Sequence, residues 1–164
     1  MVVQRGLKIL LVGGLAFLCA LTTWGNLRDP ATNYTFVRHV VSMDTISPDA
    51  VMASNAIQIP LVWSIAFWAI VAAEGLTTAL FAWGTVELFQ ARKFKARVFD
   101  QAKRFAFAGA GCGFLIWFVG FLAVGAEWFA MWQSRDWNGQ QDAFRIFASI
   151  LLVMSFVAQP EAEL

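Results

Sequence analysis

Four stretches of this sequence are long, apolar and almost free of charge, and they constrain the fold more than any other feature. A helix rises about 1.5 Å per residue, so about 20 apolar residues can cross the hydrocarbon core of a bilayer. We therefore predict an all-α integral membrane four-helix bundle, in which residues 1–164 form a single transmembrane domain. The predicted spans are residues 7–24, 61–89, 105–132 and 143–157, and the shortest, the last, should begin within the preceding polar loop.

Composition argues against the alternative of a very apolar soluble domain. Hydrophobic residues make up 59% of the chain and charged residues 14%, whereas soluble domains average about 45–50% and about 25%. A single core of this size could not bury 16 Phe and 8 Trp.

The first apolar run follows basic residues, as in a signal peptide, but it is long for one and lacks well-placed small residues before a cleavage site. We interpret it as an uncleaved first span.

The distribution of lysine and arginine predicts the orientation of the helices. The N-terminal segment supplies two basic residues, Arg5 and Lys8, and six more lie in the loop 90–104, out of 12 in the chain. Because basic loops remain on the cytoplasmic side, we expect both termini and this loop to be cytoplasmic and the loop 25–60 to be on the outer side. Tryptophans, which favour the membrane interface, agree with this orientation. Those expected near the outer interface are Trp24, Trp63, Trp128, Trp132 and Trp137.

The outer loop contains a segment, residues 34–44, whose apolar residues recur at roughly helical spacing. This pattern predicts a short amphipathic helix that lies on the outer membrane face or over the bundle. Arg38, His39 and Asp44 in this segment are candidates for outer-loop recognition. A lone histidine is more often structural than a ligand or a pH-sensitive contact, so both roles stay open for His39.

Ionisable residues at membrane depth are costly and are therefore candidates for function. Glu74 lies roughly 20 Å along the second span, near the bilayer midplane. It is either a proton or cation relay or ligand anchor, or a neutral group bonded to Thr77, Thr78 or a facing helix. Glu127 and Arg145 lie near the outer ends of the third and fourth spans, which a short loop joins. We predict that these two form a structural ion pair.

Motifs of common enzymes and metal centres are absent from the sequence, which contains no HExxH, GxSxG or glycine-rich phosphate loop. Cys19 and Cys112 lie in apolar spans and are expected to be packed thiols rather than a disulfide or metal ligands. We predict no catalytic residue, cofactor or metal site, and an enzyme is the least favoured class. The net charge of +1 gives no indication of a nucleic-acid partner.

Three segments of the sequence are together long enough to be specific to a family. Residues 34–45 read YTFVRHVVSMDT, residues 117–134 read WFVGFLAVGAEWFAMWQS, and residues 137–145 read WNGQQDAFR. They resemble the signature of a bacterial family of predicted small integral membrane proteins, the domain of unknown function 2165, over essentially the whole chain. The resemblance implies four spans and multi-pass location in the bacterial inner (plasma) membrane. It implies no activity, so no catalytic residue is transferred from it.

Two classes of function remain in view. The first is an accessory or structural protein, in contact with membrane lipids, that is a small subunit of a larger inner-membrane complex or a homo-oligomer. The alternative is a binding or transport protein for a lipid, quinone or ion. Its pocket would lie at the outer side of the bundle and be lined by Glu74, Glu127, Arg145 and His39.

Overall fold

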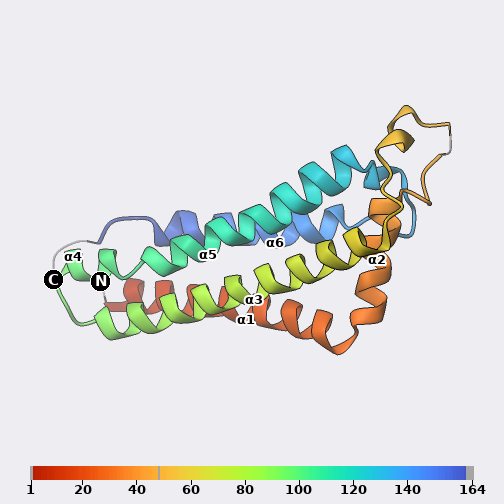
Figure 1. The fold of residues 1–164 in the computed structure, drawn as a ribbon. Helices are drawn as coiled ribbons and strands as arrows, with labels where there is room; N and C mark the ends of the chain where they lie inside the picture. The colour runs from red at the N-terminus through yellow and green to blue at the C-terminus, as the bar shows by residue number, and fades with distance from the viewer. Residues whose placement is uncertain (1, 48, 162–164) are drawn as a thin grey trace.

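The computed structural model describes residues 2–47 and 49–161, and over these residues the regular secondary structure is all helical, without strands (Figure 1). Four of the described helices are long and apolar enough to cross a membrane, as predicted, and they cover Val3–Arg28, Pro60–Ala91, Ala96–Trp128 and Gln140–Val157. In chain order the elements are α1 (Val2–Arg28), α2 (Pro30–Ser42), η1 (Val51–Asn55), α3 (Pro60–Ala91), α4 (Ala96–Gln101), α5 (Arg104–Phe114), η2 (Leu115–Trp128), η3 (Met131–Gln133) and α6 (Gln140–Val157).

The ends of the helices follow from local sequence chemistry. Pro60 stands at the first position of α3, where its missing N–H is not needed and its fixed φ suits the helix. Asp29 caps α2, since its carboxylate accepts a hydrogen bond of 3.2 Å from the backbone N–H of Thr32. Met43 ends α2 in the left-handed conformation with φ 52°. The chain therefore turns sharply on both sides of α2, which runs across the ends of the long helices.

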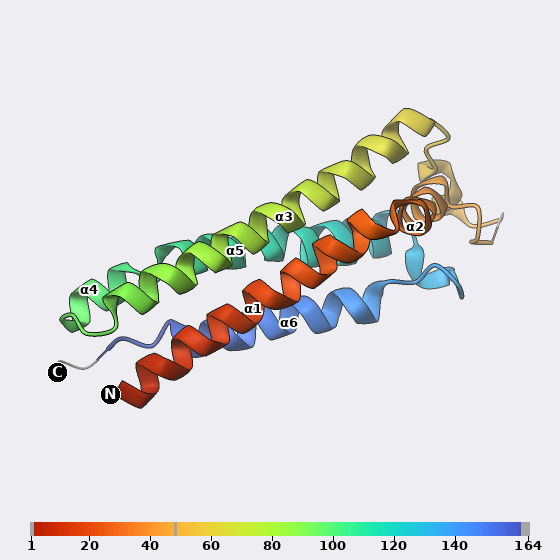
Figure 2. The same ribbon diagram turned by 90° about the horizontal axis from the view of Figure 1, so that it is seen from below.

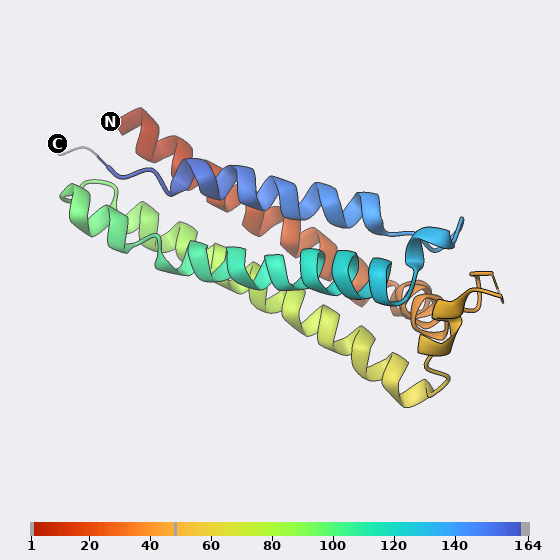
Figure 3. The same cartoon turned by 90° about the horizontal axis from the view of Figure 1, so that it is seen from above.

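The long helices run side by side as a bundle (Figures 2 and 3). α1 packs along α3, α3 packs along α5, and α6 packs against η2 and α5. We call one end of the bundle the terminal end, because the start of α1, the loop around Phe94 and the tail residue Glu161 meet there. The opposite end, which carries α2 and the segment 129–139, we call the α2 end (Figure 1).

Small residues allow the helices to approach one another closely. A Cβ on Gly84 of α3 would lie 2.8 Å from a backbone nitrogen of α5. A Cβ on Gly109 would lie 3.1 Å from the Phe81 ring, and one on Gly113 would lie 2.7 Å from Cδ1 of Ile150. Gly109 and Gly113, four residues apart on the third span, therefore form a small-residue face that packs inside the bundle.

The third span changes its winding halfway along. α5 is α-helical, but η2 is a π-helix of 14 residues, in which hydrogen bonds join residues five apart rather than four. The bond of 3.0 Å from the N–H of Phe129 to the carbonyl of Val124 continues this pattern at the end of the span. Side chains of η2 therefore point in directions that an α-helical reading of the sequence does not give.

The outer surface of the bundle is apolar. Large apolar side chains are exposed along every long helix, among them Leu10, Phe17, Trp83 and Leu152. Exposed contiguous apolar surface of this kind marks a membrane or protein partner. Its distribution around the four spans fits a lipid environment.

Candidate functional site

Helices α1, α2, α3 and α6 and the third span line a partly open cavity of about 250 Å³ in the half of the bundle nearer the α2 end. We call it the Glu74 pocket. Most of its lining is apolar, from residues such as Phe67, Ile70 and Trp117. Its polar lining residues are Thr22, Asn26, Asn33, Glu74 and Asp142.

Glu74 is the most deeply buried acidic residue of this pocket, with 2% of its surface exposed. The side-chain amide of Asn26 on α1 donates a hydrogen bond of 2.6 Å to its Oε2 atom. The hydroxyls of Thr77 and Thr78 donate instead to backbone carbonyls of α3, so the partner of the carboxyl group lies on a facing helix. Oε1 accepts no hydrogen bond from the described residues. This oxygen is therefore available to a molecule that enters the pocket.

A second cavity of about 280 Å³ adjoins the Glu74 pocket. Its lining within the described residues consists of apolar side chains and glycines, so we call it the apolar pocket. Phe36, Val37, Ile70 and Phe121 line both cavities. A polar site and an apolar site therefore share one wall, an arrangement typical of sites that bind small molecules.

α2 supplies much of that shared wall. The Phe36 ring stacks on the Phe121 ring, with 6.2 Å between centroids, and it contacts Gly139, where a Cβ would lie 2.9 Å from Cζ of Phe36. Val37, also on α2, is buried. Any widening of either cavity on this side requires movement of α2 or of its phenylalanine.

The three candidate recognition residues come together at the α2 end. Nδ1 of His39 lies 2.7 Å from Asp44 Oδ1, and Nη2 of Arg38 lies 3.0 Å from Nε2 of His39. Because arginine only donates, Nε2 accepts this bond and Nδ1–H donates to Asp44. The His39 ring also stacks on Trp137, with 4.4 Å between centroids. The stacking on Trp137 holds α2 against the segment 129–139, and the bonds to Arg38 and Asp44 fix the orientation of the ring.

The structure does not bring Glu127 and Arg145 together. Among the described residues, the ion pair of Arg145 is with Asp142, at 3.2 Å and with both side chains exposed, while Glu127 is exposed. The pair was expected because the two residues share a depth, and depth does not fix the direction in which a side chain points. The π-helical winding of η2 changes the direction of this side chain, and Asp142 lies only one helical turn from Arg145.

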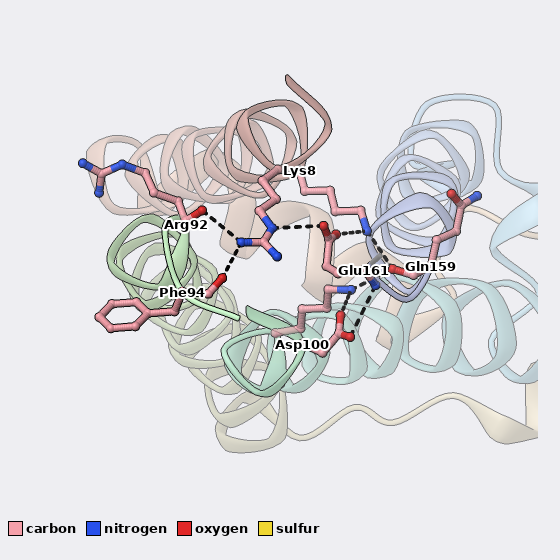
Figure 4. A network of polar contacts seen from close by, with 8 residues as sticks. Lys8, Arg92, Phe94, Asp100, Gln159 and Glu161 are labelled. Carbon is pink, nitrogen blue, oxygen red and sulfur yellow. Dashed lines mark hydrogen bonds and ion pairs between the residues drawn. The ribbon is translucent and has the colours of Figure 1, made fainter. Parts of the chain in front are cut away.

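A group of buried charges at the terminal end was missed by sequence reasoning. Arg5, Lys8 and Lys103 were counted as basic residues that set the topology, yet each is at most 3% exposed. Their acidic partners include Glu161, in the tail after α6 (Figure 4). The sequence does contain one indication of this cluster. Glu161 is an acidic residue just beyond the last span, and it lies at the same end of the bundle as both basic segments.

In the described part of the chain, no group of three or more His, Cys, Asp or Glu residues is arranged so that it could hold a metal ion. Cys19 is buried and free, and Cys112 is free and half-buried. The Cys112 thiol lies 3.7 Å from the carbonyl of Ala73. Both thiols pack within the bundle.

Four apolar spans bundled around glycine contacts, with an apolar exterior, define a multi-pass integral membrane protein. The chain belongs to the family described as predicted small integral membrane protein, the domain of unknown function 2165, whose family model matches residues 4–160. The resemblance stated from the sequence is thereby confirmed. Neither the comparison with curated proteins nor that with solved structures gives a match.

Proposed function

We propose that this protein binds a small amphipathic molecule from the membrane in the Glu74 pocket and the adjoining apolar pocket. The observation that carries the proposal is the carboxyl group of Glu74, which accepts a hydrogen bond from Asn26 on one oxygen and none from the described residues on the other, beside an apolar cavity that shares four wall residues. From the sequence an accessory role ranked first, because the sequence does not show which side chains come together in a site. The pair of cavities favours the binding role instead.

The volumes of the cavities and their polar groups limit the size and chemistry of the ligand. Each holds about 250–280 Å³, which is close to the lower bound of about 300 Å³ for small-molecule sites. A single cavity therefore fits a ring or a short chain, and an elongated molecule is needed to use both. A head group with a hydroxyl or N–H can donate to Glu74 Oε1, while a carbonyl, as in a quinone, can accept from the Asn26 amide. A lipid or a quinone has this division into polar and apolar parts.

The proposed setting is the bacterial inner membrane, with the terminal end in the cytoplasm. The support is the concentration of lysine and arginine at the terminal end, which is the pattern of cytoplasmic loops. In this orientation the Glu74 pocket lies in the outer half of the bilayer. Its ligand would enter from the outer leaflet or the outer side, past α2.

Native mass spectrometry of protein extracted in mild detergent tests the proposal directly. We expect a co-purifying small molecule, and we expect a short-chain quinone or a lysophospholipid, added to delipidated protein, to raise the melting temperature. Glu74→Gln should reduce this stabilisation, since it replaces a free acceptor oxygen by an amide. Glu87→Gln is the matched control, because Glu87 lies on the same helix but binds Arg104 outside the pocket.

Two results would count against the binding role. One is native protein without any bound small molecule, together with no stabilisation by either probe. The other is equal stabilisation of the wild type and the Glu74→Gln variant, because a ligand in this pocket must contact that side chain. A protein that instead co-purifies with a stoichiometric membrane partner would return the accessory role to first place.

A further inference from the structure

The terminal end buries three positive charges. Arg5 and Lys8 on α1 are 1% and 0% exposed, and Lys103, just before α5, is 3% exposed. Lysine and arginine are almost never buried so completely unless they are paired. Their partners are therefore informative about what this end of the bundle is built to hold.

One carboxylate from the tail bridges both cations of α1. Oε1 of Glu161 lies 2.6 Å from the Lys8 ammonium, and Oε2 lies 3.2 Å from Nε of Arg5 (Figure 4). Burial raises the pKa of Glu161, but the hydrogen bonds from Lys8 and Arg5 and the charges of Lys8 and Lys103 together outweigh burial and hold this pKa below its ordinary value. The tail thus places a charged carboxylate between two buried cations.

The tail also supplies an acceptor from its backbone. The carbonyl oxygen of Gln159 accepts hydrogen bonds of 2.7 Å from Lys8 and 2.8 Å from Lys103. Lys103 pairs further with Asp100, at 2.6 Å. Three cations from two separate segments therefore converge on three acceptor oxygens of a tail that follows the end of α6 and is not itself helical.

Counted over the described residues, the cluster carries more positive than negative charge. Three cations face the carboxylates of Asp100 and Glu161. Nη1 of Arg5 donates to the carbonyls of Arg92 and Phe94, at 3.1 and 2.7 Å. Its buried Nη2, by contrast, has no hydrogen-bond partner among the described residues. The site could therefore satisfy one more anionic oxygen than Glu161 supplies.

We propose that Arg5, Lys8 and Lys103 form a binding site for the phosphate head group of an anionic membrane lipid, and that residues 159–161 occupy this site when the lipid is absent. The cluster lies where the apolar spans end, which is the depth of lipid head groups, and basic pockets between helices bind such groups. A phosphate offers more acceptor oxygens than a carboxylate, so it can reach Nη2 of Arg5 as well.

The cations tolerate burial because an anion compensates them, either the carboxylate of the tail or the phosphate of the lipid. Without Glu161 or a substitute, Arg5 and Lys8 would lose the carboxylate that bridges them, and an uncompensated buried charge strongly destabilises a fold. Either anion stabilises the cluster, and the two exclude each other. Binding of the lipid would release the tail from the terminal end.

The test compares phosphatidylglycerol, phosphatidylcholine and inorganic phosphate, each added to the full-length protein in neutral detergent. Binding is followed by native mass spectrometry and by the shift in melting temperature. Phosphatidylglycerol should bind the wild type and phosphatidylcholine should not. Glu161→Ala should bind phosphatidylglycerol about tenfold more tightly, a change equivalent to about 1.4 kcal/mol, because the competing carboxylate is gone. Glu161→Gln provides a second variant of nearly native shape.

Further variants locate the site. Lys8→Gln should lose the preference for phosphatidylglycerol over phosphatidylcholine. Arg104→Gln should keep it, since Arg104 is a basic residue near the same end with a 70% exposed side chain. An equal effect of inorganic phosphate would support the site but assign it to a soluble phosphate. Equal binding of phosphatidylglycerol to the wild type, Glu161→Ala and Lys8→Gln would overturn the proposal.

Discussion

The contact between α3 and α5 at Gly84 gives the sharpest prediction about the fold. A Cβ at position 84 would lie 2.8 Å from the backbone nitrogen of Ala106 and 3.2 Å from its Cα. Backbone atoms in a helix cannot move aside as the end of a flexible side chain can. Gly84→Ala should therefore force α3 and α5 apart over the length of their contact.

The magnitude follows from two opposing effects. Overpacking in a filled interior costs about 1–3 kcal/mol, and a clash with backbone lies in the upper part of that range. Alanine in place of glycine favours a helix by about 1 kcal/mol, a value measured in water. We expect Gly84→Ala to lower the free energy of unfolding by about 1–2 kcal/mol.

Two glycines serve as matched controls. A Cβ on Gly75, also in α3, would meet its nearest neighbour, Thr23, at 3.8 Å, and one on Gly111 would meet nothing within 4 Å. Both alanine variants should be neutral or more stable, by up to about 1 kcal/mol. The assay is reversible unfolding in mixed micelles of mild detergent and dodecyl sulfate. A Gly84→Ala variant as stable as Gly75→Ala would refute the close approach of α3 and α5.

Three further predictions concern the termini, the α2 end and the core. The pKa of Glu161 is lower in the folded state than in the unfolded state. The contribution of this residue to stability is therefore complete above the ordinary pKa of a glutamate and is lost as pH falls through the lower folded pKa. The melting temperature of Glu161→Gln should fall less on acidification than that of the wild type. His39→Phe retains a ring on Trp137 but loses the bond to Asp44, and hydrogen exchange of α2 should become faster. Ile150→Ala removes a side chain that is 1% exposed and should cost about 2–4 kcal/mol, whereas Leu152→Ala, at a 74% exposed position, should change unfolding in micelles far less.

The number of spans was predictable because a bilayer demands long apolar segments, and such segments are visible in the sequence. The first span is longer than predicted, since α1 includes the region of Arg5 and Lys8 and extends to Arg28. Hydropathy penalises these charges at the helix ends. It contains no information about a carboxylate more than 150 residues away that neutralises them.

The side-chain partners were less predictable than the spans. The depth of Glu74 predicted either a function or a bond to Thr77, Thr78 or a facing helix, and its bond to Asn26 depends on the rotation of α1 against α3. The pairing of Glu127 with Arg145 was inferred from a shared depth alone. Depth follows from the rise per residue, whereas direction follows from the winding, and the winding changes from α to π inside the third span.

Phe36 connects the shape of the two pockets to the proposed binding role. Its ring lines both cavities and stacks on Phe121. Phe36→Ala removes a half-buried ring and should join the cavities, at a cost below the 3–5 kcal/mol of a fully buried phenylalanine, about 2 kcal/mol. Phe17→Ala, at a 66% exposed position on α1, controls for the loss of a ring on the outer surface.

A joined cavity should favour longer ligands. Among quinones with side chains of increasing length, the wild type should be stabilised most by a short one, because the Phe36 ring limits the passage between the polar and apolar pockets. The Phe36→Ala variant should be stabilised most by a longer one, measured as the rise in melting temperature over each unliganded protein. If the preferred length does not change while Phe36→Ala remains folded, the two cavities do not act as one site and the ligand uses only one of them.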